Sequence, residues 1–97
     1  MNIYYNPEKF GLSVFGEADT KESYEFDRIV VWEDRVGNLW YAEDSGCSCP
    51  IPFEYIKPSD LLLLNQASLG EFKLAARKER RSANEVEELI SRVERRC

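Results

Sequence analysis

The segment Tyr24–Glu33 constrains the fold most, because it carries apolar side chains on both of its faces. Side chains alternate between the two faces of a strand. One face here receives Phe26, Val30 and Trp32, with Arg28 among them, and the other receives Ile29 and Val31. A strand that is apolar on both faces is typical of the inside of a sheet with cover on both sides. We therefore expect this segment to be a central strand.

The residues that follow complete a hairpin. Residues 34–38 are predicted to form the hairpin loop, and Gly37 suits a left-handed backbone conformation there. The next strand is predicted over Leu39–Glu43. Trp32 and Trp40 come close to the loop on either side, so we expect the two indoles to lie near each other across the hairpin.

Three shorter patterns flank this hairpin. Alternation over Phe10–Gly16 predicts a first strand. The segment Phe53–Ile56 is predicted to be a short extended piece. Leu61–Leu64 is predicted to form a helical turn, capped by Ser59 or Asp60.

Two helices are predicted near the C-terminus. Ser68 and Glu71, and again Ser82 and Glu85, have the spacing of a capping box. Apolar residues then recur at helical spacing, namely Leu69, Phe72 and Ala76, and Val86, Leu89, Ile90 and Val93. Strands followed by helices indicate an α+β fold, with a small antiparallel sheet of three to four strands and two C-terminal helices packed on it. We expect a single domain over residues 1–97, with a sheet body at about 10–56 and a helical part at about 59–96.

The charge of −5 is unevenly distributed. Residues 1–60 hold 12 acidic and 5 basic side chains, whereas residues 61–97 hold 6 acidic and 8 basic ones. An acidic body repels phosphates, so we expect no nucleic-acid partner. The basic stretch of Lys73, Arg77, Lys78, Arg80 and Arg81 either contacts an acidic partner or nucleic acid, or is a solvated helix face. The acidic set of Glu17, Asp19, Glu22, Glu25 and Asp27 either imitates a phosphate backbone or is simply a soluble surface.

The residue types present also limit the chemistry and the compartment. The chain has no histidine, which excludes Ser–His and Cys–His catalysis. Glu43 and Asp44 are adjacent on a strand and point to opposite faces, so they do not form an acid–base pair. There is no apolar run of about 18 residues and no signal-peptide pattern, and three cysteines are an odd number for a secreted disulfide framework. We expect a non-enzymatic protein of the cytoplasm, with no membrane association and no cofactor.

The segment Asp44–Phe53 is the one that ordinary architecture explains least, because it holds two cysteines and two prolines. Cys47 and Cys49 are either small apolar residues beneath a tight turn, or ligands of a soft metal together with Cys97 and Asp44. Redox chemistry is a third interpretation, although one residue separates the thiols and not the usual two.

Recognition is a fourth interpretation, since stiff loops on a sheet scaffold often carry binding surfaces. The candidate binding residues are Asp44, Ser45, Gly46, Cys47, Ser48, Cys49, Pro50, Phe53 and Trp40. Nearby aromatic residues are either interface anchors or the core of a small domain. They are Trp32, Trp40, Tyr41, Phe53 and Tyr55.

The sequence also resembles a known group of proteins. The residues that carry the resemblance are Phe26–Asp34, Gly37, Leu39, Tyr41, Asp44–Pro50 and Pro52–Phe53. They are similar to an uncharacterised domain-of-unknown-function family of small actinobacteriophage proteins that share this Asp-Ser-Gly-Cys-Ser-Cys-Pro loop. The resemblance covers residues 10–65 and is most specific at Asp44–Pro50. It implies a phage accessory protein made in the cytoplasm of a bacterial host, and it implies no activity.

We therefore expect a non-catalytic module that binds a host or phage protein near the Asp44–Phe53 loop. One alternative is a metal-binding or thiol-redox protein that uses Cys47 and Cys49. A second alternative is a structural protein that self-assembles into a homo-oligomer through the apolar stripe of its C-terminal helix.

Overall fold

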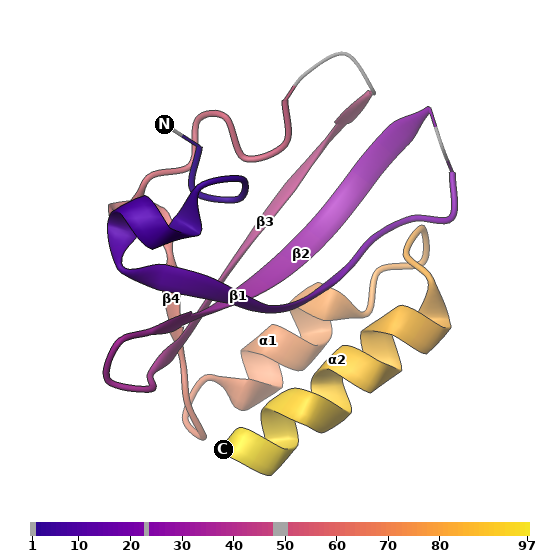
Figure 1. Ribbon diagram of the computed structural model, residues 1–97. Coiled ribbons are helices and arrows are strands. Elements are labelled where there is room, and N and C mark those ends of the chain that lie inside the picture. The colour runs from indigo at the N-terminus through magenta and orange to yellow at the C-terminus, as the bar shows by residue number, and fades with distance from the viewer. Residues whose placement is uncertain (1, 23, 48–50) are drawn as a thin grey trace.

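Strand β2 (Glu25–Asp34) lies inside a four-stranded antiparallel sheet with the order β1-β2-β3-β4 (Figure 1). The structure is a computed structural model that describes residues 2–22, 24–47 and 51–97. The remaining elements in chain order are η1 (Pro7–Phe10), β1 (Leu12–Ala18), β3 (Leu39–Cys47), η2 (Pro58–Asp60), β4 (Leu62–Leu64), α1 (Leu69–Ala76) and α2 (Ala83–Arg96). The sheet followed by two helices confirms the predicted α+β fold.

The two faces of β2 serve two separate hydrophobic cores, as its sequence predicts. Ile29 and Val31 belong to the core beneath the helices, whereas Val30 and Trp32 belong to the core on the opposite face. All four side chains are fully buried. The predicted approach of the indoles is also confirmed, because Trp32 lies directly opposite Trp40 in the β2–β3 ladder.

Helices α1 and α2 cover one face of the sheet, which we call the helix side (Figure 1). The apolar stripe of α2 faces inward, and its four members, Val86, Leu89, Ile90 and Val93, are buried. This stripe packs closely on β1 because Gly16 lies beneath it. A Cβ atom at Gly16 would stand 2.8 Å from Cδ1 of Leu89, so glycine is what permits the approach.

The opposite face, which we call the loop side, is covered by the N-terminal segment and by the connection from β3 to β4 (Figure 1). Ile3 and Phe53 are fully buried there against Trp32. The Trp32 indole donates a hydrogen bond of 3.2 Å to the carbonyl of Ile3. The core on the loop side is therefore covered largely by segments without regular secondary structure.

Three local predictions are wrong. Strand β3 continues to Cys47, so the sheet, and not a loop, contains Asp44 to Cys47. Residues 52–55 form a turn where an extended segment was predicted. Leu62–Leu64 is a strand and not a helical turn, because pairing with residues 39–41 of β3 supplies the hydrogen bonds that an isolated helical turn lacks.

The two predicted helix caps differ. The Ser82 hydroxyl accepts a hydrogen bond from the backbone of Glu85, which is one half of a capping box. The Glu85 carboxylate accepts from the backbone of Asp19 instead of Ser82, so the other half is absent. The Ser68 hydroxyl makes no such bond at α1. It donates instead to the carbonyl of Leu63 at 2.7 Å, which ties the start of α1 to the edge strand β4.

Candidate functional site

The turn that follows β3 contains the only non-glycine residue with a positive φ among the residues described. Phe53 has φ 63°, and its side chain is fully buried. A bulky residue in the left-handed region costs about 1–3 kcal/mol and persists only where its surroundings hold it. The contacts of Phe53 therefore identify what fixes the turn.

A carboxylate and two aromatic rings hold Phe53 in place. Oδ2 of Asp44 accepts a hydrogen bond of 2.8 Å from the Phe53 backbone N–H. The Tyr4 ring stacks on the Phe53 ring with centroids 5.6 Å apart, and the Trp32 ring meets it edge-on at 5.5 Å. The side-chain amide of Asn2 donates to the carbonyl of Pro52 at 2.9 Å, so the N-terminal segment clamps the turn from outside.

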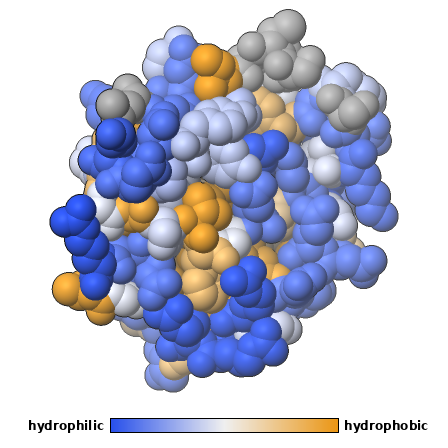
Figure 2. Space-filling model, in the orientation of Figure 1, coloured by the Kyte–Doolittle hydropathy of each residue, from blue (hydrophilic) through white to orange (hydrophobic). Residues whose placement is uncertain are grey.

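This fixed turn carries large exposed side chains next to its buried anchor. Ile51 is 51% exposed and Tyr55 is 84% exposed. Tyr5 is 58% exposed and contacts the Tyr4 ring at a centroid distance of 5.0 Å. We call Tyr5, Ile51 and Tyr55 the turn surface. Figure 2 shows a hydrophobic area at the top of the molecule, where the segment that begins at residue 51 emerges in Figure 1.

The predicted site residues divide into several groups. Ser45 is exposed and Gly46 half-buried at the end of β3. Trp40 is half-buried, and its indole donates to Oδ2 of Asp34 at 3.0 Å. Asp44 acts as the clamp for Phe53 rather than as a free side chain.

Two further outcomes concern Phe53 and the cysteines. The prediction that Phe53 contacts a partner is wrong, because its side chain is inside the loop-side core. Ser48, Cys49 and Pro50, and the side chain of Cys47, lie outside the described residues, and so does the proposed thiol pair. Within residues 2–22, 24–46 and 51–97, no three potential metal ligands gather at one place.

The basic stretch of residues 73–81 is paired within the chain. Lys73 pairs with Glu94, Arg77 with Glu87, Lys78 with Glu43, and Arg80 with Glu25. The mildly basic C-terminal part therefore meets the acidic body in the folded state. This arrangement favours the interpretation of a solvated, internally neutralised face over a nucleic-acid site.

Arg81 is the exception in this stretch, because its side chain is fully buried. Its guanidinium pairs with Asp27 at 2.9 Å and with Glu43 at 2.9 Å. It also donates to the backbone carbonyls of Asp27, Ala75 and Ala76. Arg81 therefore joins β2, β3 and the end of α1, and it satisfies the only carboxylate that β2 buries.

A second polar network lies beside the turn. The Tyr4 hydroxyl donates to both carboxylate oxygens of Glu17 at 2.8 and 2.7 Å, and the Arg28 guanidinium lies 4.9 Å from the Tyr4 ring centroid. Arg28 also pairs with Asp19 at 2.9 Å. Burial, and then the hydrogen bond to Glu17, raise the pKa of Tyr4 to about 12. The phenol therefore stays protonated at neutral pH and donates to Glu17.

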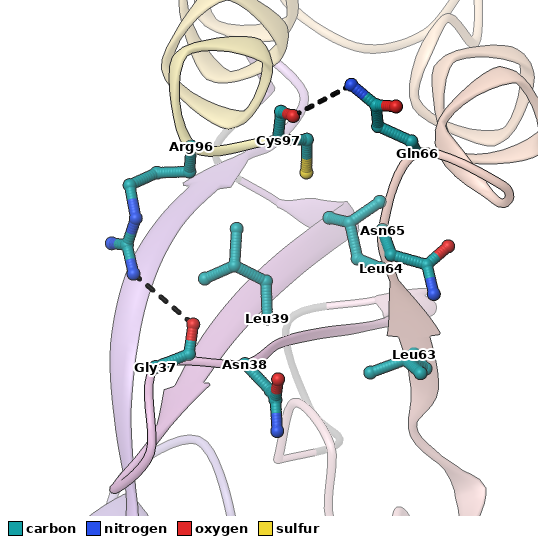
Figure 3. Close-up of a pocket in the computed structure, with 9 residues that line it drawn as sticks. All are labelled: Gly37, Asn38, Leu39, Leu63, Leu64, Asn65, Gln66, Arg96 and Cys97. Atoms are coloured by element: carbon teal, nitrogen blue, oxygen red, sulfur yellow. Dashed lines mark hydrogen bonds between the residues drawn. The ribbon is translucent and has the colours of Figure 1, made fainter.

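The hollow between the hairpin, β4 and the end of α2 has a volume of about 440 Å³ (Figure 3). Leu39, Leu63 and Leu64 form its apolar part, and Arg96 and Gln66 stand at its rim. The polar groups at the rim are already engaged. Arg96 donates to Glu33 at 2.6 Å and to the carbonyl of Gly37, and Gln66 donates to the carbonyl of Cys97. Arg96 and Gln66 are therefore engaged within the chain rather than free to orient a ligand.

The sequence matches the family described as a domain of unknown function (DUF7574) over residues 1–97. The chain belongs to this family. No curated protein and no solved structure matches it. None of the described helices is long and apolar enough to cross a membrane.

The sequence of this DUF7574 chain does not reveal the roles of two residues that shape the site, Phe53 and Arg81. Phe53 looks like any aromatic residue, and only the backbone shows its left-handed conformation. Arg81 is hidden within a run of basic residues. Its partner gives the one usable signal, because Asp27 lies on the same strand face as Ile29 and Val31, and a buried acid there requires a cation.

Proposed function

We propose that this chain is a non-catalytic protein-binding module that docks a partner through the turn surface of Tyr5, Ile51 and Tyr55. The observation that carries the proposal is the left-handed, fully buried Phe53, which is held by Asp44 while its neighbours Ile51 and Tyr55 stay exposed. Backbone strain that the surroundings maintain is concentrated at functional sites in proteins.

The physical character of the turn surface supports this proposal. Tyrosine supplies a large contact area with few rotatable bonds, and aromatic residues dominate the energy of many interfaces. A turn fixed by a carboxylate, an amide and two rings loses little conformational entropy on binding, which increases affinity for a given contact area. Tyr5, Ile51 and Tyr55 are exposed, so they contribute little to the hydrophobic core. Exposed apolar patches often mark interaction sites.

The partner class follows from the resemblance and from the charge. The loop Asp44–Pro50 is similar to that of small actinobacteriophage proteins, so we propose a phage accessory protein that engages a host or phage protein in the bacterial cytoplasm. Nucleic acid is disfavoured as a partner, because the cations at residues 73–81 are engaged with acids of the same chain.

The test compares two double variants in affinity capture from the lysate of infected host cells. Tyr5→Ser with Tyr55→Ser removes the aromatic part of the turn surface. The matched control is Tyr24→Ser with Leu74→Ser, because these side chains are 64% and 80% exposed elsewhere on the molecule. Thermal unfolding of each variant checks that the fold is retained.

The proposal predicts that the turn-surface variant loses a specific captured protein that the control variant retains. Equal capture by both variants, with both folded, would exclude the turn surface.

A thiol titration with and without chelator tests the metal or redox alternative, because three free thiols and no bound ion would exclude it. The burial of the apolar stripe of α2 against the sheet disfavours the self-assembly alternative.

A further inference from the structure

A second exposed feature lies at the opposite end of the loop side, where the β2–β3 hairpin meets the N-terminal segment. A shallow hollow of about 540 Å³ is lined there by Lys9, Phe10, Gly11, Asp34, Arg35 and Val36. In Figure 2 a hydrophobic side chain projects beside strongly hydrophilic ones at the lower left, where Figure 1 places this hairpin. Val36 at the hairpin is 82% exposed.

The two cations of this hollow differ from most others in the chain. Lys9 and Arg35 make no ion pair with any residue that the structure describes, whereas all the basic side chains at residues 73–81 are paired. The residues that line the hollow include two cations and one acid, Asp34, so their summed charge is positive in a chain of net charge −5. Such a local positive charge favours contact with a negatively charged group.

Backbone geometry orients Arg35 in this hollow. Gly11 ends η1 in the left-handed region with φ 73°, and a Cβ atom placed on it would lie 3.5 Å from Nε of Arg35. The guanidinium therefore lies next to the backbone of Gly11, where no side chain intervenes. An arginine held in this way presents a planar set of donors that matches the two oxygens of a carboxylate.

Two acids near the hollow, Asp34 and Glu33, already have hydrogen-bond partners within the chain. Oδ2 of Asp34 accepts from the Trp40 indole, and its Oδ1 accepts from the backbone of Val36 and Asn38. Glu33 is engaged by Arg96 at 2.6 Å. Arg35 also lines an adjacent smaller hollow with Glu8, Glu33 and Asp34, and it forms no ion pair with these acids among the described residues. The donors of Arg35 therefore remain free for an external acceptor.

We propose that this hollow binds an acidic peptide segment of a protein partner, with carboxylates on Lys9 and Arg35 and an apolar side chain against Val36 and Phe10. The exposed valine beside the cations distinguishes this ligand from a simple anion, because it adds apolar contact to the charge pairing. The acidic body of the chain disfavours a nucleic-acid ligand at the same place. The inference is independent of the turn surface and goes beyond it.

The test uses a short fluorescein-labelled peptide of glutamate and leucine, with a glutamine and leucine peptide as the neutral probe. Fluorescence anisotropy measures affinity, and ¹H–¹⁵N chemical shifts of the full chain locate the contact. The key variant is Lys9→Glu with Arg35→Glu. The matched control, Lys21→Glu with Lys57→Glu, makes the same change in net charge at exposed cations outside the hollow.

The proposal predicts that the glutamate and leucine peptide changes the amide chemical shifts of residues 9–11 and 34–36. Its affinity for the key variant should be lower by at least about tenfold, whereas its affinity for the control variant should not change. The neutral peptide should bind more weakly, and Tyr5→Ser with Tyr55→Ser should leave the affinity unchanged. Equal losses in key and control variants, equal binding of both peptides, or no binding at about 1 mM would each overturn it. A concentration-dependent dimer that the key variant abolishes would assign the hollow to a second copy of the chain and also overturn it.

Discussion

At the scale of single residues, Arg81 is the one cation with a fully buried side chain among the ion pairs of the described residues. Its fully buried side chain forms ion pairs with the buried Asp27 and the half-buried Glu43. We predict that Arg81→Leu lowers the free energy of unfolding by about 3–5 kcal/mol, because it leaves Asp27 without its partner in the interior. Urea denaturation followed by tryptophan fluorescence measures this change.

The exposed neighbour supplies the control for this prediction. Arg80 pairs with Glu25 at the surface, with a side chain that is 53% exposed. Arg80→Leu should leave the urea midpoint nearly unchanged, because water already solvates both partners. Similar losses in the two variants would show that Arg81 has no special role.

Asp44 is the second residue whose role can be measured directly. We predict that Asp44→Ala lowers the free energy of unfolding by about 1–2 kcal/mol, because the Phe53 N–H loses its acceptor. Amide hydrogen exchange at residues 51–56 should become faster in the same variant. Asp44→Asn keeps an oxygen acceptor and should show a smaller effect, whereas unchanged exchange in the alanine variant would contradict the clamp.

Tyr4 gives a prediction about alkaline pH. Its pKa is raised to about 12, above the ordinary value of 10.0, first by burial and then by the hydrogen bond to Glu17. Between these values the unfolded chain loses the phenolic proton and the folded chain keeps it, so stability falls as pH rises from 10 to 12. Denaturation of the native chain and of Tyr4→Phe across this range checks the sign. The variant should lose less stability over the range, and equal slopes would refute the assignment.

At the scale of elements, the contact of α2 with β1 depends on a residue without a side chain. We predict that Gly16→Ala destabilises the fold by about 1–3 kcal/mol, because its Cβ would stand 2.8 Å from the buried Leu89. Gly70 is the matched control, because a Cβ there meets nothing within 4 Å and the residue lies in α1. Gly70→Ala should be neutral or stabilising by up to about 1 kcal/mol. Thermal unfolding should therefore show a lower midpoint for Gly16→Ala and an unchanged or higher midpoint for Gly70→Ala.

The sequence predicts some elements well for a physical reason. Strand β2 and helix α2 have strong periodicities of their own, and both form nearly as expected. Leu61–Leu64 has no periodicity that separates helix from strand, so its pairing with β3 decides the outcome. The extension of β3 to Cys47 also depends on a partner, because residues 25–28 of β2 extend opposite it.

At the scale of the whole molecule, the fold separates two kinds of cover on one sheet. The helix side is closed by regular helices and internal ion pairs, whereas the loop side is closed by the N-terminal segment and the turn at residues 51–56 (Figure 1). Both surfaces proposed for partners, the turn surface and the hairpin hollow, involve the N-terminal segment of the loop side. We therefore propose that the irregular cover carries the recognition features, as loops on rigid scaffolds commonly do.

The sequence predicts a binding site at Asp44–Phe53, and the turn surface that we propose overlaps this segment only at Ile51. The Asp44–Phe53 segment marks the place, because prolines and glycine make it unusual. Phe53, which the sequence predicts to bind, is buried, whereas Tyr55, just beyond this segment, is exposed. Burial of one aromatic rather than another depends on the left-handed turn and on contacts with residues 2–5, which are distant in sequence.

The most direct measurement for the central claim is site-specific photo-crosslinking in infected cells. The chain would carry Tyr55→p-benzoylphenylalanine, and a control chain would carry the same group at the exposed Tyr24. The account predicts a discrete protein adduct from position 55 and none from position 24. Adducts of equal yield from both positions, or none from position 55 in a folded chain, would contradict the claim that the clamped turn is a docking surface.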